Sequence, residues 1–359
     1  MKRKLLFSLA LLALAPILPL QADFYWLAVG IHYNAGYNQN GGLGNYLILT
    51  NDNLEVTNYK PVKLYDVRRT VDGGTKLRKI NNQNGTAPYD GCPYGGAHYD
   101  LTLPIRDKDG NEFTFVGLDS EAFNGNNFIG SIKLPNTLEF IKTKAFIFAR
   151  YLKTCTFPED TSNMTELSDH VFDSCDLFEG PIVWPPQFTT VGEFSFAHCK
   201  KFLGFYGPSV TSVGNSAFND CPSMKAVEFG ASVTFGPSVF QNTRGARYQI
   251  LFHDAPPAFD DNNNLIGNSN GVLDWWGNGN AEATLYVPLN ANKDGPTANW
   301  AAFKQAFESK VEGNAITWPT ASGDGTWTDG SIYSKLPNKR STLRFWNPDT
   351  QTTAALLVH

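Results

Sequence analysis

The sequence predicts a mainly β protein in which stacked repeats share one core, with a cap at each end. Residues 191–205 read VGEFSFAHCKKFLGF, and residues 213–229 restate the pattern as VGNSAFNDCPSMKAVEF. The positions kept constant are apolar, whereas a chemical motif keeps its reactive groups and lets apolar positions vary. Self-similarity at a fixed period is typical of repeat architectures.

Residues 1–22 are predicted to be a signal peptide. Basic residues follow Met1, an apolar run covers residues 5–14, and LQA provides a cleavage site that ends at Ala22. An uncleaved anchor helix is the alternative, but two prolines interrupt a run that is shorter than the roughly 20 residues a membrane span needs. We therefore expect Sec-type cleavage near Ala22 and a secreted or cell-surface protein without a transmembrane segment.

Residues 23–98 are predicted to form a β-rich N-terminal cap domain. NYLILT at 45–50 and PVKLYDV at 61–67 look like short strands between stretches rich in Asn and Gly. Residues 41–44 (GGLG) have neither the spacing of a nucleotide-binding loop nor a following helix, which argues against nucleotide binding.

Six repeat units follow, each with a Phe at the same reference position. These residues are separated by steps of 23, 26, 24, 22 and 22, and they are Phe123, Phe146, Phe172, Phe196, Phe218 and Phe240. Each of the first five units continues into SIKLP, TCTFP, PIVWP, GFYGP or AVEFG, an alternating segment that predicts a half-buried strand followed by a turn. One strand and one irregular segment cannot close a core alone, so the units must stack into a solenoid.

This unit, with an apolar residue five before the Phe, a small residue one before it and often a Cys three after it, resembles the BspA-like leucine-rich repeat of exported bacterial proteins. The third unit departs from it by a one-residue offset before its strand, and the sixth has Thr243 in place of Cys. The resemblance implies a right-handed leucine-rich-repeat solenoid that serves as a binding scaffold, with ligands that differ between members.

The flanking segments extend the resemblance. YDLTLPIRDKDGNEFTFVG at 99–117 looks like a leading hairpin with an Asp-Gly turn, so residues 99–259 are assigned to this hairpin and the six repeats. Residues 260–313 are assigned to a C-terminal strand–helix cap. Residues 314–359 form a β-rich tail, in which LRFW and AALLVH could pair as strands.

Two segments support the C-terminal cap. ATLYVP at 283–288 resembles a closing strand, and residues 299–312 resemble a terminal helix. The predicted apolar face of this helix contains Phe303, Ala306, Phe307 and Lys310, with Asn299 as N-cap and Gly313 as the stop.

Composition and motifs argue against several classes of function. Charged residues make up 18% and the net charge is -5, which is too little positive charge for a nucleic-acid partner. The histidines show no metalloprotease motif, no shared repeat position and no nearby carboxylate spacing; they are His32, His98, His170, His198, His253 and His359. We expect no catalytic residues and no cofactor.

Two acidic segments have the composition of calcium sites. Residues 107–112 (DKDGNE) place Gly fourth and not sixth, so we interpret them as a hairpin turn. Residues 260–264 (DDNNN) offer oxygen ligands without a defined spacing, which leaves either a solvated loop or a calcium ion. We expect no metal site.

Cys175, Cys199 and Cys221 each follow a reference Phe by three residues and so occupy one column. Parallel Cβ directions in such a column disfavour disulfides, and a line of ligands cannot make a tetrahedral zinc site. We expect these residues to be small buried hydrophobes.

The alternation within each strand divides its residues between core and surface. The inward set is Ile132, Leu134, Cys155, Phe157, Ile182, Trp184, Phe205, Val227 and Phe229. The outward set includes a column that we predict to contact a partner, with Tyr206 as an exposed central ring: Lys133, Thr156, Val183, Tyr206 and Glu228. The alternative is a plain solvated face, with ligands bound by the caps.

Trp275 and Trp276 lie in the Asn/Gly-rich loop 255–280 and are further predicted contacts, because exposed aromatic rings stack on sugars or anchor proteins. Alternatively, they fold back over the last repeat.

The sequence thus predicts an exported, non-enzymatic recognition or adhesion protein that presents its repeats to a protein or glycan partner. A structural cell-envelope component that assembles through its caps is the alternative. An enzyme located in residues 23–98 would need a nucleophile, a base and an orienting group that we do not find there.

Overall fold

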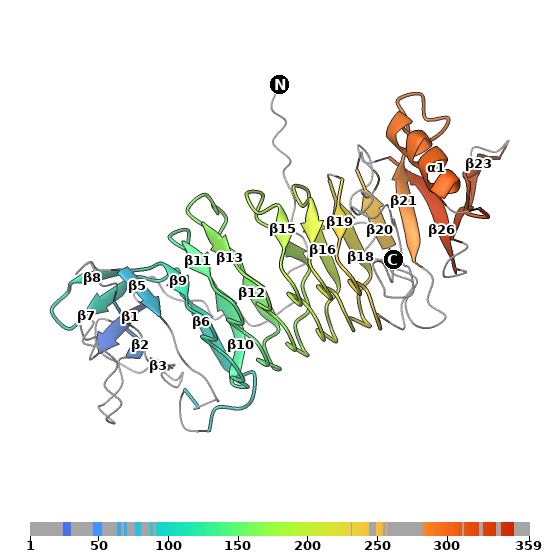
Figure 1. Cartoon of the computed structure of the whole chain (residues 1–359). Coiled ribbons are helices and arrows are strands. Elements are labelled where there is room, and N and C mark those ends of the chain that lie inside the picture. Colours follow the sequence, from blue (N-terminus) through green and yellow to red (C-terminus); the bar gives the residue numbers. More distant parts are fainter. Residues whose placement is uncertain are drawn as a thin grey trace.

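The computed structural model describes residues 24–29, 46–51, 63–65, 68–69, 76–79, 87–88, 91–230, 232–243, 249–253, 256, 283–310, 312–322, 326–334 and 339–347. The predicted signal peptide, the GGLG and DDNNN segments, Trp275, Trp276 and the AALLVH segment lie outside these residues. Within them the protein is mainly β, as predicted, and α1 (Ala298–Lys310) is the only helix. Figure 1 shows an elongated row of repeats with a sheet at each end.

Each repeat contributes two strands, where we predicted one. Each of these strands pairs in parallel with the equivalent strand of a neighbouring repeat. The longer strands carry the alternating segments of the first five repeats, and all but β14 have three or more residues; they are β10 (Ile129–Lys133), β12 (Thr154–Thr156), β14 (Ile182–Val183), β16 (Gly204–Gly207), β18 (Ala226–Phe229) and β20 (Gln249–Phe252). The second row is β9 (Gly117–Leu118), β11 (Phe140–Ile141), β13 (Glu166–Leu167), β15 (Thr190–Val191), β17 (Ser212–Val213) and β19 (Thr234–Phe235). These strands are two residues long, too short for alternation to show in the sequence.

Equivalent positions of successive repeats pair in register, as Phe205 does with Val227 and Val191 with Val213. The longer strands form one ladder up to β12 and another from β14, and the short strands break between β13 and β15. Both breaks adjoin the third repeat, the unit whose sequence departs from the pattern. There, amide hydrogen bonds such as Glu179 N to Lys153 O (3.0 Å) connect the turns.

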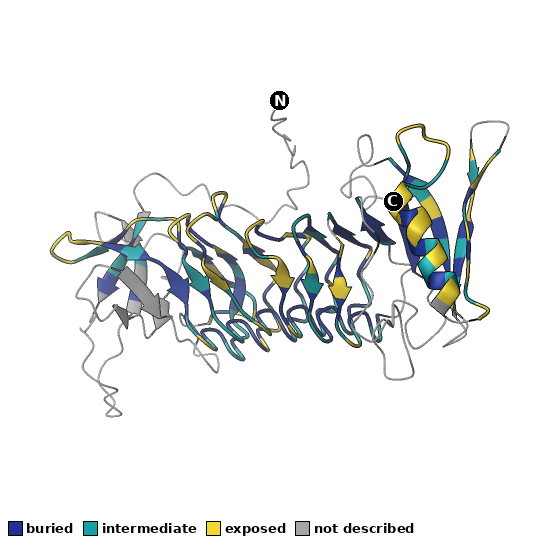
Figure 2. Cartoon of the chain, turned by 45° about the horizontal axis from the view of Figure 1, so that its top comes forward, coloured by how far each residue is buried: buried dark blue, intermediate teal, exposed yellow. Residues whose placement is uncertain are grey.

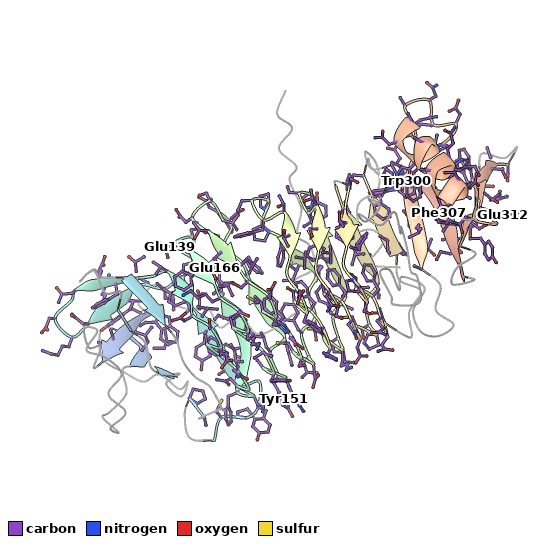
Figure 3. All side chains as sticks on the ribbon, viewed as in Figure 1. Glu139, Tyr151, Glu166, Trp300, Phe307 and Glu312 are labelled. Atoms are coloured by element: carbon purple, nitrogen blue, oxygen red, sulfur yellow. The ribbon has the colours of Figure 1, made fainter. Side chains whose placement is uncertain are left out.

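The six reference Phe rings form one continuous stack in the core, and all are fully buried. Neighbouring ring centroids lie 5.3, 5.4, 5.5, 5.5 and 5.7 Å apart, with interplanar angles of at most 16°. The predicted inward residues of the strands are buried in or packed against the same core, which confirms that assignment. Figure 3 shows side chains filling the interior along the row.

The segment around each reference Phe has left-handed backbone at two positions. In all six repeats the residues two before and two after the Phe have φ between 52° and 67°; they are Glu121, Gly125, Lys144, Phe148, His170, Ser174, Phe194, His198, Ser216, Asp220, Ser238 and Asn242. In the first five repeats, the N–H groups at these two positions and at the Phe donate to carbonyls of the next repeat, as His170, Phe172 and Ser174 do at 2.8 to 2.9 Å. A non-glycine residue with left-handed backbone costs roughly 1–2 kcal/mol. The hydrogen bonds to the next repeat offset this cost in each of the first five repeats.

The cysteine column is buried and its thiols are free, as predicted. Each thiol also donates to the carbonyl of the reference Phe in the preceding repeat: Cys175 to Phe146, Cys199 to Phe172 and Cys221 to Phe196, at 3.0 to 3.1 Å. Thr243, which replaces Cys in the sixth repeat, makes the same contact to Phe218 O at 2.9 Å. In the third to sixth repeats this position therefore holds a small side chain that donates a hydrogen bond, whereas the second repeat has the buried Ala149 there.

The N-terminal sheet has the order β3-β2-β1-β7-β8-β5-β4. Its strands are β1 (Phe24–Val29), β2 (Tyr46–Asn51), β3 (Lys63–Tyr65), β4 (Arg68–Arg69), β5 (Lys76–Lys79), β7 (Ile105–Asp107) and β8 (Glu112–Phe115). The pair β7–β8 is the predicted hairpin, and Gly110 in its turn has a φ of 80°. β6 (Ala97–Asp100) crosses the division that we placed between residues 98 and 99, and it pairs in parallel with β10.

At the other end, the ladder continues from β20 into the closing strand β21 (Thr284–Pro288). The helix α1 buries one face and exposes the other (Figure 2). Phe303 and Phe307 are buried as predicted, and Trp300, which we had not assigned to this face, contacts Phe252 with ring centroids 5.4 Å apart. Figure 3 labels Trp300 and Phe307 on the helix.

The helix begins earlier than predicted. Ala301 N donates to Thr297 O at 3.0 Å, so Thr297 occupies the N-cap position and the assignment of Asn299 was wrong. Gly313, the predicted stop, follows the helix with a φ of 95°.

The tail joins the main sheet. Its strands are β22 (Ala315–Thr317), β23 (Thr320–Ala321), β24 (Trp327–Thr328), β25 (Gly330–Ser334) and β26 (Lys339–Trp346). β26 pairs in parallel with β21 and in antiparallel fashion with β25, which pairs with β22. Trp346 is buried, and its Nε1 donates to Phe252 O at 3.0 Å.

Phe148→Asn should raise the free energy of unfolding by about 0.5–1 kcal/mol, because Asn tolerates the left-handed backbone better than Phe does. Phe148 has a φ of 58° and is 45% exposed, so little packing is lost. Arg150→Asn is the matched control, since Arg150 is exposed and has no positive φ. Chemical denaturation measures both, and a Phe148 variant no more stable than the parent would contradict the strain assignment.

Cys199→Thr should be more stable than Cys199→Val by about 1 kcal/mol, because Thr and Val have the same shape and only Thr keeps a donor for the Phe172 carbonyl. Thermal unfolding of the two variants measures this difference. Equal melting temperatures would show that the column needs small size alone.

Candidate functional site

The outward residues of the first strands form an exposed surface, here called the open strand face. It consists of His98, Asp100, Ser131, Lys133, Thr154, Thr156, Val183 and Tyr206, on β6, β10, β12, β14 and β16. Lys133 lies between Asp100 and Thr156 on neighbouring strands. Val183, which is 58% exposed, lies beside Tyr206. The surface therefore carries mostly small side chains and little net charge.

Two residues of this face were missed by the sequence analysis. His98 and Asp100 lie on β6, which we had divided between the cap and the hairpin because no reference Phe precedes it. His98 Nδ1 and Ser131 Oγ lie 2.8 Å apart. Partial burial of the ring, followed by the positive charge of Lys153, lowers the pKa of His98 below 6.5.

Glu228 does not belong to the exposed surface. Its strand β18 is buried along its whole length, and Glu228 is only 3% exposed. The expectation that it faces solvent was therefore wrong. Its Oε1 pairs with His253 Nε2, while its Oε2 is buried without a hydrogen-bond partner.

The outer face is closed at β18, β20 and β21, whose residues are mostly apolar and buried on both faces. Ala226, Leu251, Tyr286 and Trp346, from β18, β20, β21 and β26, form a second buried cluster separate from the main core. The sequences QILF and TLYVP could have indicated this, since near-continuous apolar runs are typical of strands buried on both faces.

Tyr206 lies at the boundary between the open and closed parts of this face. It is half-buried, and burial, followed by the negative charge of Glu228 on the next strand, raises the pKa of its hydroxyl. Tyr206 is thus less exposed than we expected, and replacing it will also affect packing.

An aromatic patch lies beside the open strand face and was also missed. Tyr94 is 60% exposed, and its ring centroid lies 5.2 Å from that of Phe128 and 5.1 Å from that of Tyr151. These residues precede β6, β10 and β12, respectively, so the patch adjoins the starts of these strands. Figure 3 labels Tyr151 at the lower edge of the row. Phe128 and Tyr151 both stand five residues after a reference Phe, which is the signal that could have identified the patch.

Three histidines contact carboxylates, contrary to our expectation from sequence spacing. Asp173 contacts two of them, with His170 Nδ1 at 3.1 Å and His198 Nδ1 at 3.3 Å, and His253 pairs with Glu228. His198 and Asp173 come from adjacent repeats, so their distance in sequence conceals the contact. Across the described part of the chain, no three His, Cys, Asp or Glu side chains gather in a group that could hold a metal.

The described residues include no helix with the length and apolar character needed to cross a membrane.

Comparison with known proteins identifies the repeats. Residues 117–247 match the BspA type leucine rich repeat region, in six copies. No curated protein matches the chain.

The chain is similar to several solved structures, including the following three. A T. pallidum leucine rich repeat protein is 23% identical over 53% of this chain and 79% of its own, with a TM-score of 0.40. A leucine rich cell surface protein from Faecalibacterium prausnitzii A2-165 is 14% identical over 70% and 72%, with a TM-score of 0.37. A leucine-rich repeat protein from Bacteroides ovatus ATCC 8483 is 14% identical over 62% and 70%, with a TM-score of 0.31.

His98 should make stability depend on pH. Because the folded state lowers its pKa below 6.5, the unfolded chain binds more protons just below that pH. The corresponding stability is present above about pH 6.5 and is lost as the pH falls through the folded-state pKa. His98→Gln should therefore lose less stability than the parent between pH 7 and pH 5, measured by chemical denaturation. Identical pH profiles for the two proteins would contradict this.

Proposed function

We propose, from the match of residues 117–247 to the BspA type leucine rich repeat region, that the protein is an exported, non-enzymatic recognition or adhesion protein. Its repeats are proposed to form a right-handed solenoid, with a β-rich cap at the N-terminal end and a strand–helix cap at the other. A repeat-based binding role agrees with the family. The partner is a protein or a glycan.

The partner is proposed to contact the open strand face together with the aromatic patch. The observation that carries this proposal is the exposure of Tyr94 (60%) and Val183 (58%), two apolar side chains on an otherwise small and polar surface. Exposed aromatic anchors surrounded by neutral contacts are typical of the energetic centres of interfaces. Lys133, Thr156 and Tyr206 would supply polar contacts between the anchors.

The charges of this face determine the kind of binding. Among its residues only Asp100 and Lys133 are charged at neutral pH, and they lie opposite each other on β6 and β10. A nearly neutral, shallow surface gives little electrostatic steering, so modest affinity with weak salt dependence is expected.

A glycan and protein array probed with residues 23–359 would identify the partner class. Tyr94→Ala and Val183→Asp should each weaken binding of the identified partner by about tenfold with little change in melting temperature, because both side chains are largely exposed. Glu228→Gln, on the buried part of the same column, is the matched control and should bind like the parent.

If Tyr94→Ala and Val183→Asp both bind the partner as tightly as the parent, the open strand face is not the binding site, and the caps become the next candidates. Self-association of the chain without any foreign ligand would support the structural role instead, as a component that assembles through its caps.

A further inference from the structure

The tail contains a cavity that lies outside the open strand face. It has a volume of about 320 Å³ and is lined by Pro319, Trp327, Thr328, Asp329, Arg344 and Phe345, from the β23–β24 hairpin and from β26; we call it the tail pocket. This volume is at the lower end of the range of about 300–1,000 Å³ usual for small-ligand sites. The tail pocket therefore suits one ring-sized group.

Two aromatic rings form perpendicular walls of the tail pocket. The rings of Trp327 and Phe345 meet at 86°, with centroids 4.9 Å apart, and both are partly exposed. Trp318 stacks behind Phe345 at 6.2 Å without lining the cavity, which fixes the position of that ring. Rigid, partly exposed aromatic walls offer flat apolar contact with little loss of side-chain entropy.

The polar wall is an ion pair. Arg344 donates from Nε to Asp329 Oδ1 at 2.8 Å and from Nη2 to Asp329 Oδ2 at 2.9 Å. Both side chains are 48% exposed. Hydrogen bonds to Asp329 and then to Tyr286 raise the pKa of Arg344 above its usual range, so the guanidinium remains charged at any ordinary pH.

Within the ion pair, both the Arg344 guanidinium and the Asp329 carboxylate can still hydrogen-bond a ligand. A guanidinium has five N–H donors, and each carboxylate oxygen accepts more than one hydrogen bond, so donors and acceptors remain side by side at the rim. Thr328 adds a hydroxyl, which already bonds Thr320 Oγ1 at 2.5 Å.

This chemistry selects the class of ligand. Arg344 and Asp329 neutralise each other's charge, so the pocket attracts neither cations nor anions overall. A cationic ligand would be repelled by the Arg344 guanidinium, and an anionic ligand would be repelled by the Asp329 carboxylate. Neighbouring hydroxyl groups on a neutral ring both accept from N–H groups and donate to carboxylates, while the C–H face of the ring packs on an aromatic wall. A neutral sugar combines these properties.

We propose that the tail pocket binds one neutral sugar residue of a glycan, with Trp327 packing on the ring and the Arg344–Asp329 pair bonding adjacent hydroxyls. This site is separate from the open strand face, and it does not depend on the function proposed for that face.

The test uses residues 23–359 and four neutral probes: the methyl glycosides of glucose, galactose, mannose and N-acetylglucosamine. Tryptophan fluorescence and calorimetry should detect binding of at least one of them at millimolar concentration. Trp327→Ala should weaken that binding by about tenfold or more. Arg344→Lys, which keeps the charge but loses the planar fork, should also weaken it.

Matched controls distinguish sugar binding in the tail pocket from sugar binding elsewhere on the chain. Trp318→Phe keeps an aromatic ring beside Phe345 while removing a tryptophan that does not line the tail pocket, and it should bind the sugar like the parent. Val183→Asp, which tests the open strand face, should not change sugar affinity either. Circular dichroism of each variant establishes that it has folded.

Choline and methyl glucuronide, as cationic and acidic probes, complete the test. The proposal is overturned if none of the four neutral glycosides binds, if either charged probe binds more tightly than all of them, or if folded Trp327→Ala and Arg344→Lys both bind like the parent. None of these outcomes would affect the proposal for the open strand face, whose tests use Tyr94 and Val183.

Discussion

The N–H groups of each repeat must find acceptors on the next repeat, and the rest of the structure depends on this requirement. Left-handed residues on both sides of each reference Phe turn alternate N–H groups toward the neighbouring repeat, at a local cost that the hydrogen bonds offset. The resulting register places equivalent residues directly above one another. The Phe stack, the cysteine column and the outward strand columns are consequences of this register.

The same requirement explains the two ends. A repeat with no neighbour leaves unpaired strand edges, which invite association with other chains. At the C-terminal end, β21, β26, β25 and β22 continue the ladder, and α1 packs Trp300 against Phe252. At the N-terminal end, β6 pairs with β10, and β7 and β8, which follow β6 in the chain, belong to the N-terminal sheet.

The sequence predicted what repeats along the chain and missed what connects distant residues. The Phe column and the inward strand residues have a fixed period, so they could be assigned from spacing alone. The contact of Asp173 with His198, and that of Trp346 with Phe252, join residues from different repeats or ends and have no local pattern. Alternation likewise assigned Glu228 to the outward direction correctly, but it could not show that this part of the face is buried.

The burial of Glu228, Leu251 and Tyr286 also separates the two proposed binding regions. Val183, Tyr206, Glu228, Leu251, Tyr286 and Arg344 form one continuous row of strand partners. Tyr206 and Arg344 lie four strand spacings apart, roughly 19 Å at about 4.8 Å per strand. A single sugar in the tail pocket therefore cannot reach the open strand face. Only a ligand that spans this distance could occupy both regions, and linkage would then raise its affinity above that of either region alone.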